Sequence, residues 1–139
     1  MFSSVDWVGV VLAALAAFGV GAVWFAPPVF GNRWGALVKA YAKLSDEDMK
    51  PSAPPMIFWL IGAFINAITF DVLMGASKAY SVTDGLVMGG LVGLGIGLPL
   101  ASWPVIFARQ PRALWLINVG AFTAMQLVMG LVLGARAAA

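Results

Sequence analysis

Residues 7–25 read WVGVVLAALAAFGVGAVWF, and this unbroken apolar run decides the fold class. No residue in it carries a charge, a side-chain amide or a hydroxyl group. At about 1.5 Å per residue, an α-helix of about 20 residues crosses the roughly 30 Å of hydrocarbon in a bilayer. Because lipid offers the backbone no hydrogen-bond partner, such a run must be helical. We therefore interpret residues 7–25 as a transmembrane helix.

Three further apolar runs of similar length follow, at about residues 56–74, 86–107 and 114–133. The composition agrees, because only 10% of the residues are charged, against about 25% in soluble domains. The mean hydropathy is +0.95. A membrane β-barrel would need strands of alternating polarity, and no segment alternates. The sequence predicts an all-α polytopic membrane protein, a single four-transmembrane-helix bundle over residues 1–139.

The residue types exclude much chemistry. The chain has no Cys and no His, which removes disulfides, thiolate nucleophiles and imidazole acid–base catalysis. We expect no catalytic, cofactor-binding or metal-binding residues, and no enzymatic activity. The net charge of +2 and the lack of a basic face argue against nucleic acid as a partner.

The basic residues predict an orientation in a bacterial inner membrane. Cytoplasmic loops carry an excess of Lys and Arg. With both termini outside, Lys78 and Arg136 lie on the outer side and the other six basic residues lie inside. Those six are Arg33, Lys39, Lys43, Lys50, Arg109 and Arg112. The first apolar run is also too long for a signal peptide and follows no Lys or Arg, so we expect it to remain as a span.

Residues 27–55 form the main polar segment between the first two spans. We expect an interfacial helix at Asn32–Lys43, with its aromatic and aliphatic side chains on one face. Ser45 and Asp48 have the spacing of a helix N-terminal capping box. Because Pro51 follows closely, only a short turn is expected there.

Small residues recur every four positions on the first and third spans. The two rows are Gly9, Ala13, Ala17 and Gly21, and Gly85, Gly89, Gly93 and Gly97. Such rows let another helix backbone approach closely, either within the bundle or in a homo-oligomer, of which a two-fold dimer is favoured. Each residue of the first row precedes its counterpart in the second row by the same number of positions, 76. This supports the hypothesis of two diverged helical-hairpin repeats, with the first and third spans parallel and central.

Six polar residues inside the second and fourth spans need a reason, since polar groups in hydrocarbon are costly. They are Asn66, Thr69, Asp71, Asn118, Thr123 and Gln126. One interpretation is interhelical hydrogen bonding that sets the helix register. The other is a polar path in the outer half of the bundle, with Asp71 as its ionisable member. Asp71 could also pair with Lys78 at the outer interface.

The most distinctive segment follows the first span and reads GAVWFAPPVFGNRW, residues 21–34. Its interfacial motif consists of Trp24, Pro27, Pro28, Phe30, Gly31, Arg33 and Trp34. This segment resembles the pattern G-x-x-W-Y-S-P-x-x-F-G-x-x-W of the bacterial membrane-protein family called domain of unknown function 1761. The resemblance continues in residues 44–49, in Asp84-Gly85 and in residues 116–120. It implies a four-helix membrane protein and no particular activity.

Two departures from the family pattern stand out. Phe25-Ala26 replaces Tyr-Ser, so a role for that phenol or hydroxyl is absent here. The prolines at 51, 54 and 55 interrupt a helix that is continuous into the second span in relatives.

Together these features predict a non-enzymatic protein of assembly or interaction. The alternative is a small transporter or channel that uses the polar path. The bilayer is the expected partner, and the sequence specifies no small-molecule ligand.

Overall fold

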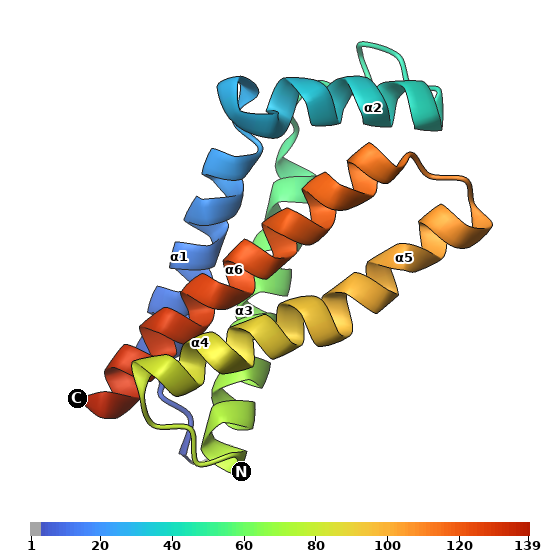
Figure 1. Cartoon of the computed structure of the whole chain (residues 1–139). Helices are drawn as coiled ribbons and strands as arrows, with labels where there is room; N and C mark the ends of the chain where they lie inside the picture. The colour runs from blue at the N-terminus through green and yellow to red at the C-terminus, as the bar shows by residue number, and fades with distance from the viewer. Residues whose placement is uncertain (1–3) are drawn as a thin grey trace.

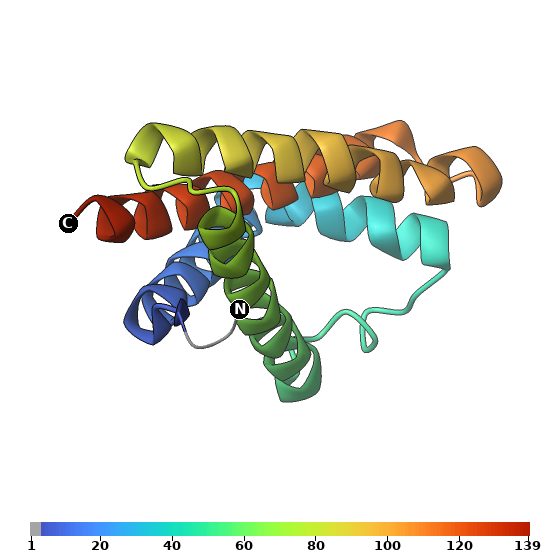
Figure 2. The ribbon, with the colours of Figure 1, turned by 90° about the horizontal axis from the view of Figure 1, so that it is seen from below.

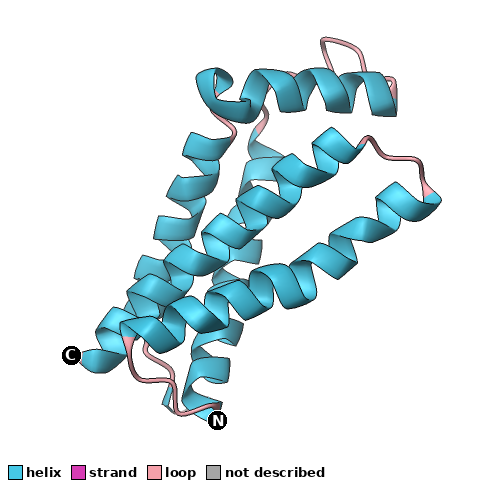
Figure 3. Cartoon of the chain, in the orientation of Figure 1, coloured by secondary structure: helices cyan, strands magenta, loops and turns pink. Residues whose placement is uncertain are grey.

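The computed structural model describes residues 4–139, and within this range the chain contains helices and loops but no β-strand (Figure 3). The elements are α1 (Trp7–Trp24), η2 (Pro27–Gly31), α2 (Asn32–Ala42), α3 (Ala53–Ala76), α4 (Val82–Gly90), η3 (Leu91–Gly97), α5 (Leu98–Phe107) and α6 (Arg112–Ala138). Here η2 and η3 are π-helical.

Four helices are long and apolar enough to cross a membrane. They are α1, α3, α6 and the continuous helix Val82–Phe107, which consists of α4, η3 and α5. The chain is therefore a multi-pass, all-α membrane protein, as the sequence predicts. Three spans begin earlier than their apolar runs. For the third, the Ser81 hydroxyl caps the helix by accepting from the Asp84 N–H at 3.0 Å.

Prolines at 54 and 55 do not interrupt the second span. They lie in the first turn of α3, where backbone N–H groups have no partner within the helix. The interruption lies earlier, between the end of α2 at Ala42 and the start of α3 at Ala53.

The central helix of the bundle is α6. It is 44% buried over its most apolar window, against 17% for α3 and for the third span. In Figure 2, the α4–α5 helix lies on one side of α6, and α1 and α3 lie on the other. The prediction that the first and third spans form the central pair is therefore wrong. Each of them packs on α6 instead, and α1 also packs on α3.

Both rows of small residues lie in helix interfaces, and all eight residues are buried. A Cβ on Gly85 would lie 2.0 Å from the carbonyl oxygen of Gly130, and a Cβ on Gly89 would lie 2.6 Å from that of Gln126. The backbones of α4 and α6 thus touch directly. On α1, a Cβ on Gly21 would lie 2.2 Å from the Trp59 ring of α3. The two rows therefore face α6 and α3 rather than each other.

The interfacial segment turns the chain sharply after α1. Ala26 is extended, as the residue before a proline prefers, and η2 begins at Pro27. The Gly31 N–H donates to the Ala26 carbonyl at 3.0 Å. A Cβ on Gly31 would lie 2.2 Å from the Phe25 carbonyl oxygen, so this close turn requires glycine.

Helix α2 then crosses the end of the bundle, as Figure 1 shows. The Trp34 indole N–H donates to the Asn118 side-chain oxygen of α6 at 3.0 Å. The Tyr41 hydroxyl donates to the carbonyl of Ala108, just after α5, at 2.9 Å. These two bonds fasten α2 to both helices of the last hairpin. The helix expected at residues 32–43 is therefore present, over Asn32–Ala42, and is attached to the bundle.

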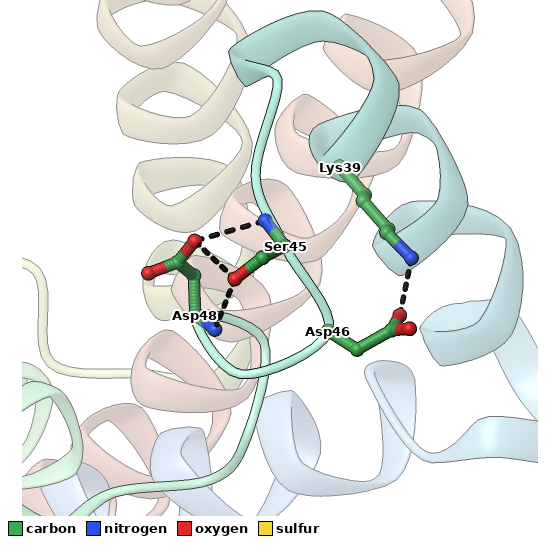
Figure 4. Close-up of polar contacts among 4 residues, drawn as sticks. All are labelled: Lys39, Ser45, Asp46 and Asp48. Carbon is green, nitrogen blue, oxygen red and sulfur yellow. Dashed lines mark hydrogen bonds and ion pairs between the residues drawn. The ribbon is translucent and has the colours of Figure 1, made fainter.

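Between α2 and α3, the chain forms the short turn expected at residues 45–48 (Figure 4). The Ser45 N–H donates to the Asp48 carboxylate at 2.8 Å, and the Asp48 N–H donates to the Ser45 hydroxyl at 3.2 Å. This is the reciprocal pattern of a capping box, with Asp as the returning acid. The Ser45 hydroxyl and N–H lower the pKa of Asp48. Lys39 and Asp46 form an ion pair that fastens the turn to α2.

Candidate functional site

A cavity of about 620 Å³ lies where the N-terminus of α1 meets the C-terminal ends of α3 and α6. Both chain termini lie at this end of the bundle (Figure 1). The cavity has an apolar lining that includes Met74 and Leu133. Its acidic and basic side chains are Asp6, Asp71 and Arg136, each from a different helix or helix end. Two carboxylates and one guanidinium leave this site with a formal excess of one negative charge.

Asp6 is hydrogen-bonded to both of the other charged residues of the site. Its carboxylate caps α1 by accepting the Gly9 N–H at 3.0 Å. The same carboxylate receives two hydrogen bonds from Arg136, with Nη2 at 3.0 Å from Oδ1 and Nε bonded to Oδ2. The guanidinium first, and the Gly9 N–H second, lower the pKa of Asp6. An anion at a helix N-terminus and a cation at a helix C-terminus are each favoured by the helix dipole.

Asp71 lines the same cavity. Its carboxylate accepts the backbone N–H of Asp6 at 3.2 Å. Among the described residues, the ion pairs are Lys39–Asp46, Lys50–Glu47 and Arg136–Asp6. The pairing of Asp71 with Lys78 considered from the sequence is therefore not formed. Asp71 is half-buried and lines the cavity, and no cation of the described residues forms an ion pair with it.

The six polar residues of the predicted path are dispersed in the structure. Asp71 alone among them lines this cavity. Thr69 is exposed and its hydroxyl donates to the Ile65 carbonyl of its own helix at 2.9 Å. Asn118 lies at the opposite end of the bundle, where it accepts from Trp34. Asn66 is half-buried on α3.

Thr123 and Gln126 lie one turn apart on α6, against the glycine row of the third span. Gln126 is 0% exposed, and neither its Nε2 nor its Oε1 has a hydrogen-bond partner. The Thr123 hydroxyl oxygen is also buried without a partner. Unpaired polar atoms cost free energy in a medium of low dielectric constant, so this pair is the least satisfied part of the core.

The interfacial motif gathers at the other end of the bundle. Trp24 stacks on Phe30, with ring centroids 4.8 Å apart, and Phe25 meets Trp34 edge to face at 5.4 Å. The Trp24 indole N–H donates to the Ile117 carbonyl of α6 at 3.1 Å. Pro27, Pro28 and Arg33 are exposed. The motif therefore joins α1, η2 and α2 to α6 through aromatic contacts.

Sequence reasoning missed Asp6 and Arg136 as site residues. Asp6 directly precedes the first apolar run, at an N-cap position, and Arg136 follows the last one. With an even number of spans, both ends of the chain must emerge on the same side. This topology was the sequence signal that Asp6 and Arg136 lie at the same end of the bundle. Within residues 4–139 the structure contains no group of three or more residues suited to hold a metal ion.

Comparison with known proteins supports the resemblance stated for residues 21–34. The family described as a protein of unknown function (DUF1761) matches residues 8–134, which include most of all four spans. No curated protein and no solved structure matches the chain significantly. Because the match covers well over half of its length, the chain belongs to the DUF1761 family of proteins of unknown function.

Proposed function

We propose that this protein is a non-enzymatic component of the bacterial inner membrane that acts by assembly, and that its first partner is a second copy of the same chain. The observation that carries this proposal is the position of α5. The first half of the third span, α4 and η3, packs closely on α6, whereas α5 diverges from it toward the loop (Figure 1).

No residue of α5 is buried. The side chains of Leu100, Trp103 and Phe107 are 62–72% exposed, and Trp103 stacks on Phe107 with ring centroids 5.1 Å apart. Lipid accommodates apolar side chains, so exposure alone is no argument for a partner. A partner is supported by the contrast within one span, because no residue of α5 is buried whereas α4 and η3 pack tightly on α6. A two-fold related α5 would supply a neighbour through an isologous contact.

Cross-linking of single cysteines in native membranes tests the assembly. The chain has no Cys, so each position from 98 to 107 can carry the only thiol. Disulfide-linked dimers are expected at positions on one face of α5, such as Leu100, Trp103 and Phe107. Ile65→Cys on α3 is the matched control, because Ile65 is 61% exposed and also apolar. Equal cross-linking at Ile65 and throughout α5 would reject the α5 interface.

The proposed orientation puts α2 in the cytoplasm and both termini outside. It follows from the excess of Lys and Arg at the α2 end. An impermeant maleimide applied to intact cells should label Ser77→Cys, in the exposed loop after α3, and not Ala42→Cys, at the end of α2. The reverse labelling pattern would invert the assignment.

A small transporter or channel is the second candidate, and the cavity at Asp71 favours it. The cavity is large, carries an excess negative charge and lies on the proposed outer side. Transport would require water to reach deeper into the bundle, toward the unpaired amide of Gln126. Labelling of Gln126→Cys by a water-soluble thiol reagent, protected by a transported cation, would support this function. A thiol that stays unreactive in the folded protein, while Ser77→Cys reacts, would count against it.

A further inference from the structure

Two further cavities lie toward the other end of the bundle, between α1 and α6. The first, of about 450 Å³, is lined by Gly19, Val20, Val23, Trp24, Val29 and Ala124. The second, of about 280 Å³, also includes Trp24, together with Arg33, Ala113 and Leu116. Because both contain Trp24, they adjoin. Together they form one groove that follows α6 from Ala113 to Ala124, roughly 16 Å of helix.

The groove is shaped by the fixed ring of Trp24 and by the missing side chain at Gly19. The Trp24 ring lies against Gly120, where a Cβ would approach its Cζ2 atom to 2.7 Å. Its indole N–H is held by the Ile117 carbonyl, and Phe30 stacks on it. Trp24 is therefore a fixed part of the lining that the two cavities share. At Gly19 an added Cβ would meet no atom within 4 Å, so the missing side chain leaves the deeper part of the groove open.

The two ends of the groove differ in polarity. The deeper end consists of apolar side chains and glycine from α1, η2 and α6. The shallow end carries Arg33, at the start of α2, where the chain leaves the hydrocarbon. A molecule that fits both ends has an apolar chain and an anionic head.

The charges around the shallow end are unbalanced. Lys39 is neutralised by Asp46 and Lys50 by Glu47, while Asp48 is held in the Ser45 turn. Among the described residues, four basic side chains at this end have no ion-pair partner. They are Arg33, Lys43, Arg109 and Arg112. Clusters of basic residues beside a membrane span attract anionic lipid head groups.

We propose that this groove is a binding site for one anionic phospholipid molecule, with an acyl chain along Gly19, Val23 and Ala124 and the phosphate at Arg33. The site is independent of the α5 assembly surface, which lies on the other side of α6. Trp24 would lie beside the lipid at the junction of chain and head group, the depth that tryptophan prefers in membranes.

Native mass spectrometry of the full chain in mild detergent tests the site with dioleoyl phosphatidylglycerol and dioleoyl phosphatidylcholine as probes. The wild-type protein should retain one phosphatidylglycerol and bind it more tightly than phosphatidylcholine. Each basic residue near a membrane contributes about fivefold in affinity for anionic lipid. Arg33→Gln should therefore weaken phosphatidylglycerol binding about fivefold. Lys43→Gln removes the same charge at a position that lines neither cavity, so it should weaken phosphatidylglycerol binding clearly less than Arg33→Gln does.

A second pair of variants tests the apolar end. Gly19→Leu fills the groove and should reduce the bound fraction of both lipids severalfold. Gly62→Leu is the matched control, because an added Cβ there also meets nothing within 4 Å and Gly62 lies on α3, away from the groove. Equal binding of the two lipids, equal losses in Arg33→Gln and Lys43→Gln, or wild-type binding by Gly19→Leu would each overturn the proposal. Loss of a dimer rather than of lipid in Gly19→Leu would assign the groove to a second copy of the chain instead.

Discussion

The carboxylate of Asp6 and the guanidinium of Arg136 form a two-point ion pair that joins positions 130 residues apart. It connects the N-cap of α1 to the last turn of α6, the central helix. Through its backbone N–H, Asp6 also reaches the Asp71 carboxylate of α3. One residue thus ties together three helix ends on the side of the membrane where the chain begins and ends.

This ion pair predicts coupled losses of stability. Arg136→Gln and Asp6→Asn should each lower the melting temperature in detergent, because each removes the paired charge. The double variant should lose less than the two single losses added together, since the residues act on one interaction. Arg112→Gln, which removes an unpaired charge at the other end, is the control. Additive losses would mean that Asp6 acts only as a helix cap.

The lowered pKa of Asp6 predicts a pH dependence of stability. The folded-state pKa lies below the ordinary 3.8, so the folded protein binds this proton less readily than the unfolded chain. The stabilisation is complete above pH 3.8 and is lost as the pH falls through the lowered folded-state value. Melting temperatures measured between pH 6 and pH 2.5 should fall more steeply at the acid end for wild type than for Asp6→Asn. Parallel curves would remove Asp6 as the cause.

The backbone contact between α4 and α6 predicts opposite effects for neighbouring glycines. Gly89→Ala should destabilise the fold by about 1–3 kcal/mol or more, since its Cβ would overlap the Gln126 carbonyl. Gly90→Ala should be neutral or stabilising by up to about 1 kcal/mol, because its Cβ meets open space and Ala favours the helix. Unfolding in mixed micelles with a denaturing detergent measures both. Similar values for the two variants would show that α4 does not pack as described.

Three basic residues end helices in the left-handed conformation: Lys43, Lys78 and Arg109 have φ of 54–55°. Ala79 N–H donates to the Met74 carbonyl at 2.9 Å, which closes the C-terminal motif around Lys78. Lys78→Gly should be more stable than Lys78→Ala by roughly 1 kcal/mol, because a Cβ is unfavourable at positive φ. Both variants lose the same charge, so their difference in unfolding free energy isolates the backbone effect. Equal stabilities would contradict the left-handed geometry.

Because its amide is unpaired, Gln126 is expected to destabilise the core. Gln126→Met keeps the length of the side chain and removes two unsatisfied atoms, so the unfolding free energy should rise by about 1 kcal/mol. Thr123→Val tests the neighbouring unpaired hydroxyl in the same way. A clear loss of stability in Gln126→Met would indicate that the amide does find a partner in the membrane, such as an internal water molecule.

The interfacial motif shows how far local sequence reasoning reaches. The conformation of residues 26–31 is determined by local sequence, because Pro27 and Pro28 stop α1 and Gly31 permits the close turn. The helix at Asn32–Ala42 was predictable for the same local reason. Its attachment was not, because Trp34 meets Asn118 and Tyr41 meets Ala108 across long stretches of chain.

The four spans and the all-α class follow from sequence alone, because a long apolar run in lipid has helix as its one satisfactory backbone conformation. The partners of those helices were decided only by tertiary structure. A row of small residues predicts that another helix backbone comes close, but it does not predict which helix that is. The row on α1 turned out to face α6 and α3, and the row on the third span faces α6, a helix whose own sequence looks no more central than the others. The ion pair of Asp6 with Arg136 exists for the same reason, since packing on α6 brings the two ends of the chain within hydrogen-bonding distance.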